Sequence, residues 1–555
     1  MKPLFLARLV GSQEQMGAQH GRLIAADAQA LVGFYRTMPE RTLAGGMGAA
    51  SRFVVRQLAT AWQARLAQDR PAEFAARTRA YVDAVAEQVP GSERWIARLQ
   101  LAVMDTMQNC VTLAARAQLG PFATPLGARA SAAAIPACTS VMAWGSATVD
   151  GELMFARNFD FPGVGVWDRA PAFVTCVPDR GMRYGFFATR GADAPVVTVV
   201  NEAGLVMAPH TRWHRDITWG GAMIVDVVHE IARSAETLED AIRIARSRPA
   251  SSSWGLAIGS ARERAGLVLE LAGRHVEIVR PPAGAEHLAC ANRYRAPALL
   301  ANQFAASAAW AHHSDHRERR MRALVEARTR PLTPRDLAGF LGDRMQGGVR
   351  RHLGSIIAQP TNVHAVVVAP AARRAWVGVD EAPSCEGTWA ELAWQWDGPA
   401  GGWELGNTSA AGFEAQVIPG FTEPHDAATR HVREGVRVFE HDHDIGAARA
   451  SIEKAVALAP DDPSLRLAAA WLALESGARD RAVIHVHAGL ATETEPYRRG
   501  QLLACGVRAS EDRALAKRWD SELARMPAGD AFDELRAGAR RRGRIHTNLV
   551  MCDAY

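Results

Sequence analysis

The stretch Ile135-Pro136-Ala137-Cys138-Thr139-Ser140 divides the chain into two parts of different character. Before it, residues 127–137 are mostly small, a composition typical of an exposed or mobile connector. After it, the pattern becomes strand-like and leads through Asp150-Gly151, a tight-turn signal, to Arg157-Asn158-Phe159-Asp160. This arrangement predicts that the chain cuts itself between Ala137 and Cys138. The freed Cys138 would carry a thiol nucleophile and an α-amine able to act as its base.

The part before Cys138 is predicted to be helical. Apolar residues recur at three- and four-residue spacings in residues 53–66, 74–89 and 95–119. We therefore expect residues 1–137 to form a helical segment, a propeptide or first subunit that self-cleavage separates covalently from the rest of the chain.

The part after Cys138 is predicted to contain two sheets. Strands are expected on both sides of Asp150-Gly151, and hairpins around 179–181, around 202–204, between 256 and 278 and between 365 and 379. Two helices interrupt the strands near 222–233 and 238–246, with Thr237 as a cap of the second. This order favours an α+β fold with helices packed outside two sheets, over residues 138–420.

The last part is predicted to be helical and repetitive. Ala448, Ile452 and Pro460 fit the second helix of a tetratricopeptide unit, and Ala482 and Val486 follow Ala448 and Ile452 by 34 residues. We expect a tetratricopeptide-like region over residues 425–545. It could support the catalytic part or bind a protein partner.

Composition excludes several classes of protein. The chain has 555 residues, of which 48% are hydrophobic and 22% charged, typical of a globular protein with two or three domains. Its 64 basic residues include only three lysines, so the arginine richness indicates coding bias rather than nucleic-acid binding. No apolar run is long enough for a membrane span, and the N-terminus is a poor secretory signal, so a cytoplasmic enzyme is expected.

Cysteines and histidines do not suggest a metal or a disulfide framework. Seven cysteines are spread along the chain without regular spacing. The histidine groups 312–316, 441–443 and 485–487 lack further ligands at recognisable spacing. No glycine-rich phosphate loop is found in the required context, so we expect neither a metal nor another cofactor.

The motifs around Cys138 resemble a known family of enzymes. Cys138-Thr139-Ser140, Asp150-Gly151 and Arg157-Asn158-Phe159-Asp160 are similar to the start of the N-terminal-nucleophile hydrolases, in particular penicillin acyltransferase (acyl-coenzyme A:isopenicillin N acyltransferase) and, more distantly, the choloylglycine hydrolases. The motifs Gly11, Met16-Gly17 and His20-Gly21 resemble the family's propeptide, and Asn201-Glu202-Ala203-Gly204-Leu205 resembles its Asn-Glu-x-Gly-Leu turn. The resemblance implies a four-layer αββα fold.

The resemblance also implies roles for individual residues. Cys138 would be the nucleophile, Asp160 would hold its α-amine, and Arg157 would lie beside the thiolate. Asn201 would form the oxyanion hole through its side-chain amide, with a simple turn former as the alternative. Similarly, Arg157 and Asp160 could be only a structural ion pair. Asn292 and Arg317, in Ala289-Cys290-Ala291-Asn292-Arg293-Tyr294 and Ser314-Asp315-His316-Arg317, resemble later active-site elements.

The reaction expected from these motifs is acyl transfer through a Cys138 thioester. The substrate would be a small acylated molecule, an amide or a thioester, and the acyl acceptor would be water or an amine, so amidase and acyltransferase remain equally open. A lipid amidase or esterase of phospholipase-B-like or ceramidase-like type is an alternative. Another is an inactive scaffold whose repeats bind a partner. The two fragments are expected to stay associated after cleavage.

Overall fold

The computed structural model describes residues 3–36, 49–89, 91, 100–117, 137–303, 308–398, 401–405, 413–541, 545 and 547–554. Its core is a pair of sheets. The nine-stranded sheet has the order β10-β9-β8-β7-β6-β5-β4-β1-β17, and the seven-stranded sheet has the order β11-β2-β3-β14-β15-β16-β18. The expected small-residue connector, apart from Ala137, lies outside the described residues.

Most of the strands are runs of residues that are buried on both faces. The nine-stranded sheet contains β1 (Phe5–Gly11), β4 (Pro171–Pro178), β5 (Tyr184–Thr189), β6 (Thr198–Asn201), β7 (Leu205–Thr211), β8 (Ser253–Ser260), β9 (Ala265–Ala272), β10 (His275–Val279) and β17 (Gly401–Leu405). The seven-stranded sheet contains β2 (Ala137–Ala143), β3 (Met154–Asp160), β11 (His287–Cys290), β14 (Asn362–Ala369), β15 (Arg374–Gly378), β16 (Trp389–Trp394) and β18 (Phe413–Ile418). Two small hairpins are β12 (Met345–Gln346) with β13 (Val349–Arg350), and β19 (Thr547–Asn548) with β20 (Asp553–Ala554).

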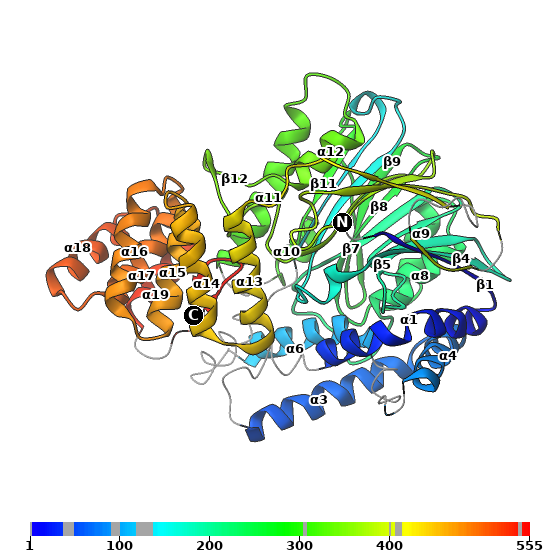
Figure 1. Ribbon diagram of the computed structural model, residues 1–555, viewed down its shortest axis with the longest axis horizontal. Helices are drawn as coiled ribbons and strands as arrows, with labels where there is room; N and C mark the ends of the chain where they lie inside the picture. Colours follow the sequence, from blue (N-terminus) through cyan, green and yellow to red (C-terminus); the bar gives the residue numbers. More distant parts are fainter. Residues whose placement is uncertain are drawn as a thin grey trace.

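The two sheets pack face to face with helices on both outer sides (Figure 1). One apolar cluster joins the inner faces and includes Phe155 of β3, Phe173 of β4 and Val366 of β14. A second joins the outer face of the seven-stranded sheet to α11 (Ala308–Glu326) and α12 (Pro334–Leu341). On the outer face of the nine-stranded sheet lie α8 (Ile224–Ser234) and α9 (Leu238–Arg246). Thr237 and Asp240 form a capping box at the start of α9, as Thr237 was expected to do.

Helices from both ends of the chain complete the fold. The first segment supplies α1 (Gln13–Arg36), α3 (Ala49–Gln68), α4 (Ala72–Gln88), η1 (Gln100–Ala102) and α6 (Val103–Ala117), which lie together along one side of the sheets in Figure 1. The short helices η2 (Gly145–Ala147), η3 (Trp167–Arg169) and α10 (Pro297–Leu300) lie in connections between strands. No helix in the described part of the chain is long and apolar enough to cross a membrane.

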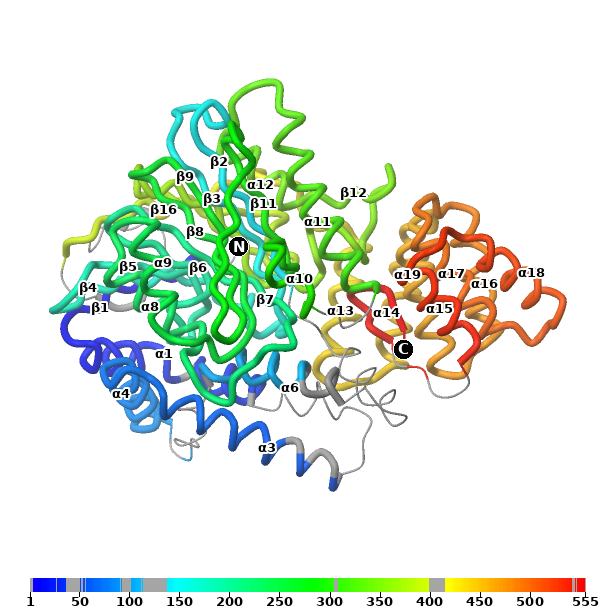
Figure 2. Tube along the Cα trace, turned by 180° about the vertical axis from the view of Figure 1, so that it is seen from behind, coloured from blue at the N-terminus to red at the C-terminus, as the bar shows by residue number. Residues whose placement is uncertain are grey.

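The C-terminal region, which we define as α13 to β20, packs beside the sheets, as both views show (Figure 2). Its helices are α13 (Ala427–Asp442), α14 (Ile445–Leu458), α15 (Pro463–Glu475), α16 (Arg479–Thr492), α17 (Pro496–Ala509), α18 (Arg513–Ala524) and α19 (Asp530–Arg540). The repeated residues Ala448, Ile452, Ala482 and Val486 are all buried, on α14 and α16. Their tetratricopeptide-like character stays a prediction.

Two local predictions differ from the structure. The first segment is not only helical, because Phe5–Gly11 forms β1, which pairs in parallel with β4 and antiparallel with β17. A short apolar run gives no periodicity that separates a buried strand from a helix end. The expected tight turn at Asp150-Gly151 is also longer, since β2 ends at Ala143 and β3 begins at Met154, with η2 between them.

Candidate active site

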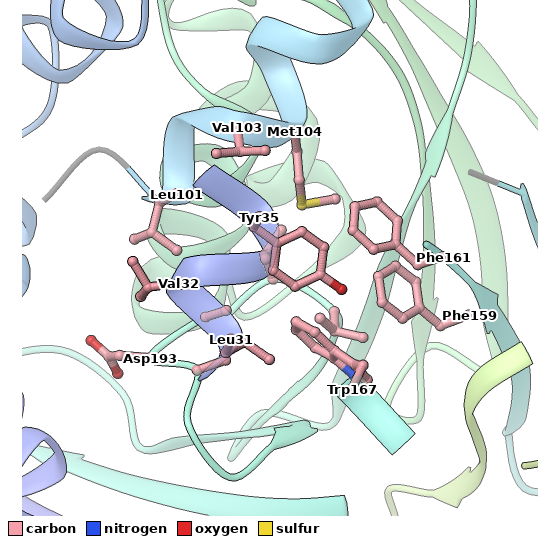
Figure 3. Close-up of a pocket in the computed structure, with 14 residues that line it drawn as sticks. Leu31, Val32, Tyr35, Leu101, Val103, Met104, Phe159, Phe161, Trp167 and Asp193 are labelled. Atoms are coloured by element: carbon pink, nitrogen blue, oxygen red, sulfur yellow. The ribbon is translucent and has the colours of Figure 1, made fainter. Parts of the chain in front are cut away.

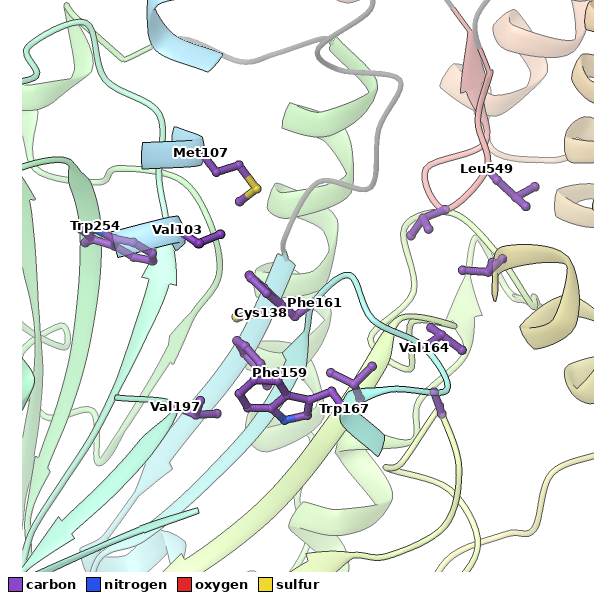
Figure 4. Close-up of a cluster of buried hydrophobic side chains, with 14 of the residues drawn as sticks. Val103, Met107, Cys138, Phe159, Phe161, Val164, Trp167, Val197, Trp254 and Leu549 are labelled. Atoms are coloured by element: carbon purple, nitrogen blue, oxygen red, sulfur yellow. The ribbon is translucent and has the colours of Figure 1, made fainter. Parts of the chain in front are cut away.

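Cys138 lies near the start of β2, where the strand is buried between its neighbours. In the β2–β3 pair Cys138 is opposite Phe159, and Ala137 is opposite Asp160. Both members of an antiparallel pair point to the same face of a sheet, so the thiol and the Phe159 ring share one environment. Phe159 and Phe161 lie beside Cys138 in Figure 4, and only 2% of Cys138 is exposed.

Arg157 holds its guanidinium beside the sulfur. Its Nη2 lies 3.4 Å from Cys138 Sγ and donates to the Pro209 carbonyl oxygen at 2.6 Å. Its Nη1 donates to Thr198 Oγ1 at 3.3 Å. The guanidinium also lies 5.0 Å from the centre of the Phe159 ring. These contacts fix a positive charge next to the thiol, where it favours the thiolate.

Asn292 and Arg317 hold the backbone of Cys138. The Cys138 backbone N–H donates to Asn292 Oδ1 at 3.0 Å. Arg317 donates from Nη1 to the Cys138 carbonyl oxygen and to Thr139 Oγ1, both at 2.7 Å, and from Nη2 to Asn292 Oδ1 at 2.8 Å. Asn292 Nδ2 in turn donates to Thr211, at 3.0 Å to its carbonyl oxygen and 2.9 Å to Oγ1. The start of β2 is thus fixed from two sides.

Asp160 is a buried carboxyl group with one hydrogen-bonded oxygen. Asn362 Nδ2 donates to its Oδ1 at 3.1 Å, and its Oδ2 lies 4.0 Å from Arg317 Nη1. Burial raises the pKa of Asp160 to about 7, against the lowering effect of Arg317, Asn362 and Arg157. A carboxyl group with this pKa exchanges protons near neutral pH, which suits a base.

The thiol of Cys138 is held mainly in its neutral form. Burial raises its pKa, and the nearby charge of Asp160 acts in the same direction. Arg157 lowers the pKa through its charge and its hydrogen bond, but the net direction is upward. Attack by this sulfur therefore needs a base to take its proton.

Asn201 is not brought to Cys138. Its Nδ2 donates to the Ala235 carbonyl oxygen at 2.8 Å, and its Oδ1 accepts from the Leu205 N–H at 3.0 Å. Both ends of the amide are therefore occupied, one within the β6–β7 turn, where Gly204 has a φ of +84°, and the other at the carbonyl that ends α8. This geometry favours the turn-former interpretation of the Asn-Glu-x-Gly-Leu motif over the oxyanion-hole role.

Several polar residues at the site have no motif that points to them. Asn362, at the start of β14, and Thr211, at the end of β7, contact Asp160 and Asn292 as described above. Ser140 Oγ lies 2.9 Å from His210 Nε2, and burial together with three nearby arginines holds the pKa of His210 well below its usual value. In the sequence, Asn362 and Thr211 stand out only as polar residues at the ends of apolar strands. That position does not indicate which side chain each of them contacts.

An apolar pocket lies beside Phe159, the strand-pair partner of Cys138 (Figure 3). Phe159, which is paired with Cys138, is part of its wall. The aromatic rings of Tyr35, Phe161 and Trp167 enclose one end, with ring centres 5.6 Å apart between Tyr35 and Phe161 and 6.0 Å apart between Tyr35 and Trp167. The other lining residues are Leu31, Val32, Leu101, Val103, Met104, Ala192, Asp193, Ala194, Val196 and Val197. Residues from before and after Cys138 therefore form the pocket together.

Histidines, cysteines and carboxylates occur throughout the part of the chain that the structure describes. Within that part of the chain, no group of three or more histidine, cysteine, aspartate or glutamate residues is arranged to hold a metal ion. The described cysteines are all free.

Comparison with known proteins gives one family match. A family model described as acyl-coenzyme A:6-aminopenicillanic acid acyl-transferase matches residues 147–382, less than half of the chain. The match contains Arg157, Asp160, Asn292 and Arg317, and begins after Cys138. No curated protein matches the chain.

One solved structure with a weak similarity is a Caenorhabditis elegans N-acylethanolamine-hydrolyzing acid amidase ortholog. It is 15% identical over 42% of this chain and 93% of its own length, with a TM-score of 0.31. At this level the likeness carries no argument about fold or function.

Proposed function

We propose that the chain is a self-processing acyltransferase or amidase of the N-terminal-nucleophile type, with Cys138 as its nucleophile. The observation that carries the proposal is the convergence of Arg157, Asn292 and Arg317 on Cys138, with Asp160 opposite Ala137. These residues come from four separate parts of the sequence. The family match to an acyl-transferase, over the segment that supplies all of them except Cys138, supports the same reaction class.

Self-cleavage would proceed by an N-to-S acyl shift. Cys138 Sγ adds to the carbonyl carbon of Ala137, and the bond from that carbon to the Cys138 nitrogen breaks. The thiol proton passes to the departing nitrogen, which becomes the α-amine, and Asp160, whose charge acts on the Cys138 thiol, would influence that transfer. Water then cleaves the thioester, giving the carboxyl group of Ala137 and restoring the thiol.

Turnover would use the same atoms. The new α-amine takes the thiol proton, and the sulfur attacks the acyl carbonyl of the substrate to form a thioester. Asn292 Oδ1, which already accepts from the Cys138 nitrogen at 3.0 Å, would hold the amine. Arg157, 3.4 Å from the sulfur, would stabilise the thiolate. Water or an amine would then accept the acyl group.

The acyl group is proposed to be apolar. The pocket beside Phe159 is lined almost wholly by aliphatic and aromatic side chains, and the carboxylate of Asp193 is bonded to Arg77 and His20. An apolar chain in this pocket would gain about 0.8 kcal/mol for each buried methylene. This supports acyl amides or thioesters with an apolar acyl group, and it keeps open the lipid amidase or esterase reading.

Intact-mass measurement on the purified protein tests the proposal. We expect two fragments from the wild-type chain, the second beginning at Cys138, and one uncut inactive chain from Cys138→Ala. Cys505→Ala is the matched control, because Cys505 is a buried cysteine of α17, in the C-terminal region. A wild-type chain that stays intact on prolonged incubation, or a Cys138→Ala chain that is cut, contradicts self-cleavage by this thiol. Incubation with a short acyl thioester should add one acyl group to the fragment that carries Cys138.

A further inference from the structure

The segment 351–362, between β13 and β14, connects the C-terminal region to the active site. It begins in a group of contacts with α15, α16, α17 and the β19–β20 hairpin. It ends at Asn362, the donor to Asp160. We call it the connecting loop.

A buried ion pair holds the start of the connecting loop. Arg351 donates from Nη1 and Nη2 to the two carboxylate oxygens of Glu493, each at 2.6 Å. Glu493 follows α16, and both side chains are buried. Two parallel bonds fix the direction of the guanidinium as well as its position.

The next residues of the loop are bonded to α15. The backbone N–H and Nδ1 of His352 lie 2.8 and 2.7 Å from Asp462 Oδ2. The N–H of Leu353 donates to Ser464 Oγ at 3.1 Å. His352 and Leu353 belong to neither a sheet nor a helix, so their buried backbone N–H groups need other hydrogen-bond acceptors. The side chains of Asp462 and Ser464 provide them.

The middle of the loop is bonded to α17 and to the C-terminal hairpin. Arg498 donates to Ser355 Oγ from Nη2 and to the Met551 carbonyl oxygen from Nη1, each at 2.6 Å. The N–H of Gly354 donates to the Val550 carbonyl oxygen at 3.1 Å. Arg498 is buried, so these bonds are protected from water.

The far end of the loop reaches Asp160 through a short series of bonds. Gln359 Nε2 donates to the Gly354 carbonyl oxygen at 2.9 Å, and the N–H of Asn362 donates to the Gln359 carbonyl oxygen at 2.9 Å. Asn362 Nδ2 then donates to Asp160 Oδ1 at 3.1 Å. The connecting loop therefore joins the C-terminal region to the residue that donates to the Asp160 carboxyl group.

We propose that the C-terminal region positions Asp160 through the connecting loop, and that Glu493, Arg351 and Arg498 are positioning residues for the reaction of Cys138. A shift of about 1 Å in a reacting group can cost on the order of 10²-fold in rate. Asp160 accepts a hydrogen bond from Asn362 on one oxygen, so movement of Asn362 changes both its place and its charge stabilisation. The inference rests on the proposed function, because it assigns the C-terminal region a part in that reaction.

The test compares two charge-removing substitutions in the full-length protein. Glu493→Gln removes the charge that holds Arg351. Glu522→Gln is the matched control, because Glu522 pairs with Arg499 at 2.6 Å within the C-terminal region and both side chains are about one third exposed. Ser355→Ala is a gentler second variant, which removes the one loop side chain bonded to Arg498.

For Glu493→Gln we expect kcat for acyl transfer to fall about 10-fold or more with KM unchanged, and the acid limb of the pH profile to move. Hydrogen–deuterium exchange should rise in peptides covering 355–366. Ser355→Ala should give the same changes in smaller size, and Glu522→Gln should give none. A purely stabilising role would lower the melting temperature without changing kcat or the pH profile.

Normal kcat and an unchanged pH profile in Glu493→Gln overturn the inference, even if the melting temperature falls. Unchanged exchange in the connecting loop overturns it as well. A wild-type chain that neither cuts itself nor forms an acyl-enzyme refutes the proposed function, and the exchange measurement then still decides whether the C-terminal region orders the loop. The two failures are therefore distinguishable.

Discussion

The backbone nitrogen of Cys138 donates to Asn292 Oδ1 over 3.0 Å, so the atom that becomes the α-amine already has its acceptor in the uncut chain. Arg317 donates to the same oxygen at 2.8 Å, and Thr211 accepts from the other end of the amide. Asn292 is therefore held rigidly by groups that do not depend on cleavage. A site built in this way is ready for turnover as soon as the peptide bond is broken.

Asn292→Ala should lower kcat far more than Asn201→Ala. The first removes the acceptor of the Cys138 nitrogen, and we expect a loss of about 10²-fold or more. The second removes one bond within the β6–β7 turn and one to the end of α8, and we expect it to lower stability by about 1–2 kcal/mol with little change in kcat. Steady-state kinetics give kcat for both variants, and thermal unfolding gives their stability. A larger rate loss for Asn201→Ala would restore its oxyanion-hole role.

The sequence predicts the residues of the site better than their arrangement. Arg157 and Asp160 share a motif with fixed spacing from Cys138, and strand pairing alone brings them together. Asn201 also lies in a recognisable motif, but this motif reflects the turn between β6 and β7 and not a contact with Cys138. Nothing in the sequence reveals that the turn lies at the end of β6 remote from Thr198, which contacts Arg157.

Long-range partners account for most of what the sequence could not predict. Asn362 is 202 residues from Asp160, and its role depends on the register between β14 and β3. Similarly, β1 joins the nine-stranded sheet through pairing with β4 and β17, which are distant in sequence. Local pattern can predict that a strand forms, but the choice of neighbour depends on the packing of the whole sheet.

Asp160 should make stability depend on pH in a defined direction. Its pKa is raised to about 7 in the folded chain from 3.8, so the folded state binds the proton more tightly than the unfolded state. The protonated carboxyl group contributes to the free energy of unfolding in full below about pH 4. This contribution falls as the pH rises to about 7, and above that pH the total loss is on the order of 4 kcal/mol. Asp160→Asn removes this dependence.

Urea unfolding of Cys138→Ala and Cys138→Ala/Asp160→Asn at pH 5 and pH 8 measures the effect, because neither chain is cut. The double variant should gain stability relative to the single variant on going from pH 5 to pH 8. An equal difference at both pH values would show that Asp160 titrates at its ordinary pKa when folded.

The apolar pocket should set the preferred length of the acyl group. Val32→Phe places a larger side chain on the pocket wall, so kcat/KM for a long apolar acyl amide should fall by about 10-fold, while that for the acetyl analogue should stay nearly unchanged. Val149→Phe is a suitable control, because Val149 is exposed and does not line the pocket. Equal losses on both substrates would place the acyl group elsewhere.

A buried ion pair should contribute to holding together the fragments produced by cleavage. Arg77 of α4 donates from Nη2 to Asp193 Oδ1 at 2.6 Å and from Nε to Asp193 Oδ2 at 2.8 Å, while His20 Nδ1 lies 2.9 Å from Oδ1. Arg77 and His20 precede the cleavage point, and Asp193 follows it. Asp193→Ala leaves Arg77 buried without its partner, which typically costs about 3–5 kcal/mol. The fragments should then separate at a clearly lower urea concentration in size-exclusion chromatography.

An exposed pair between the same fragments gives the matched control. Arg190 lies 2.6 Å from Asp27 of α1, and both side chains are about 30% exposed. Because water screens such a pair, Asp27→Ala should cost only about 0–1 kcal/mol and should barely shift the urea concentration at which the fragments separate. If the two substitutions have equal effects, the buried Arg77–Asp193 pair stabilises the association of the fragments no more than the exposed pair does. Association would then rest on the pairing of β1 with β4 and on the apolar contacts of α1 and α6.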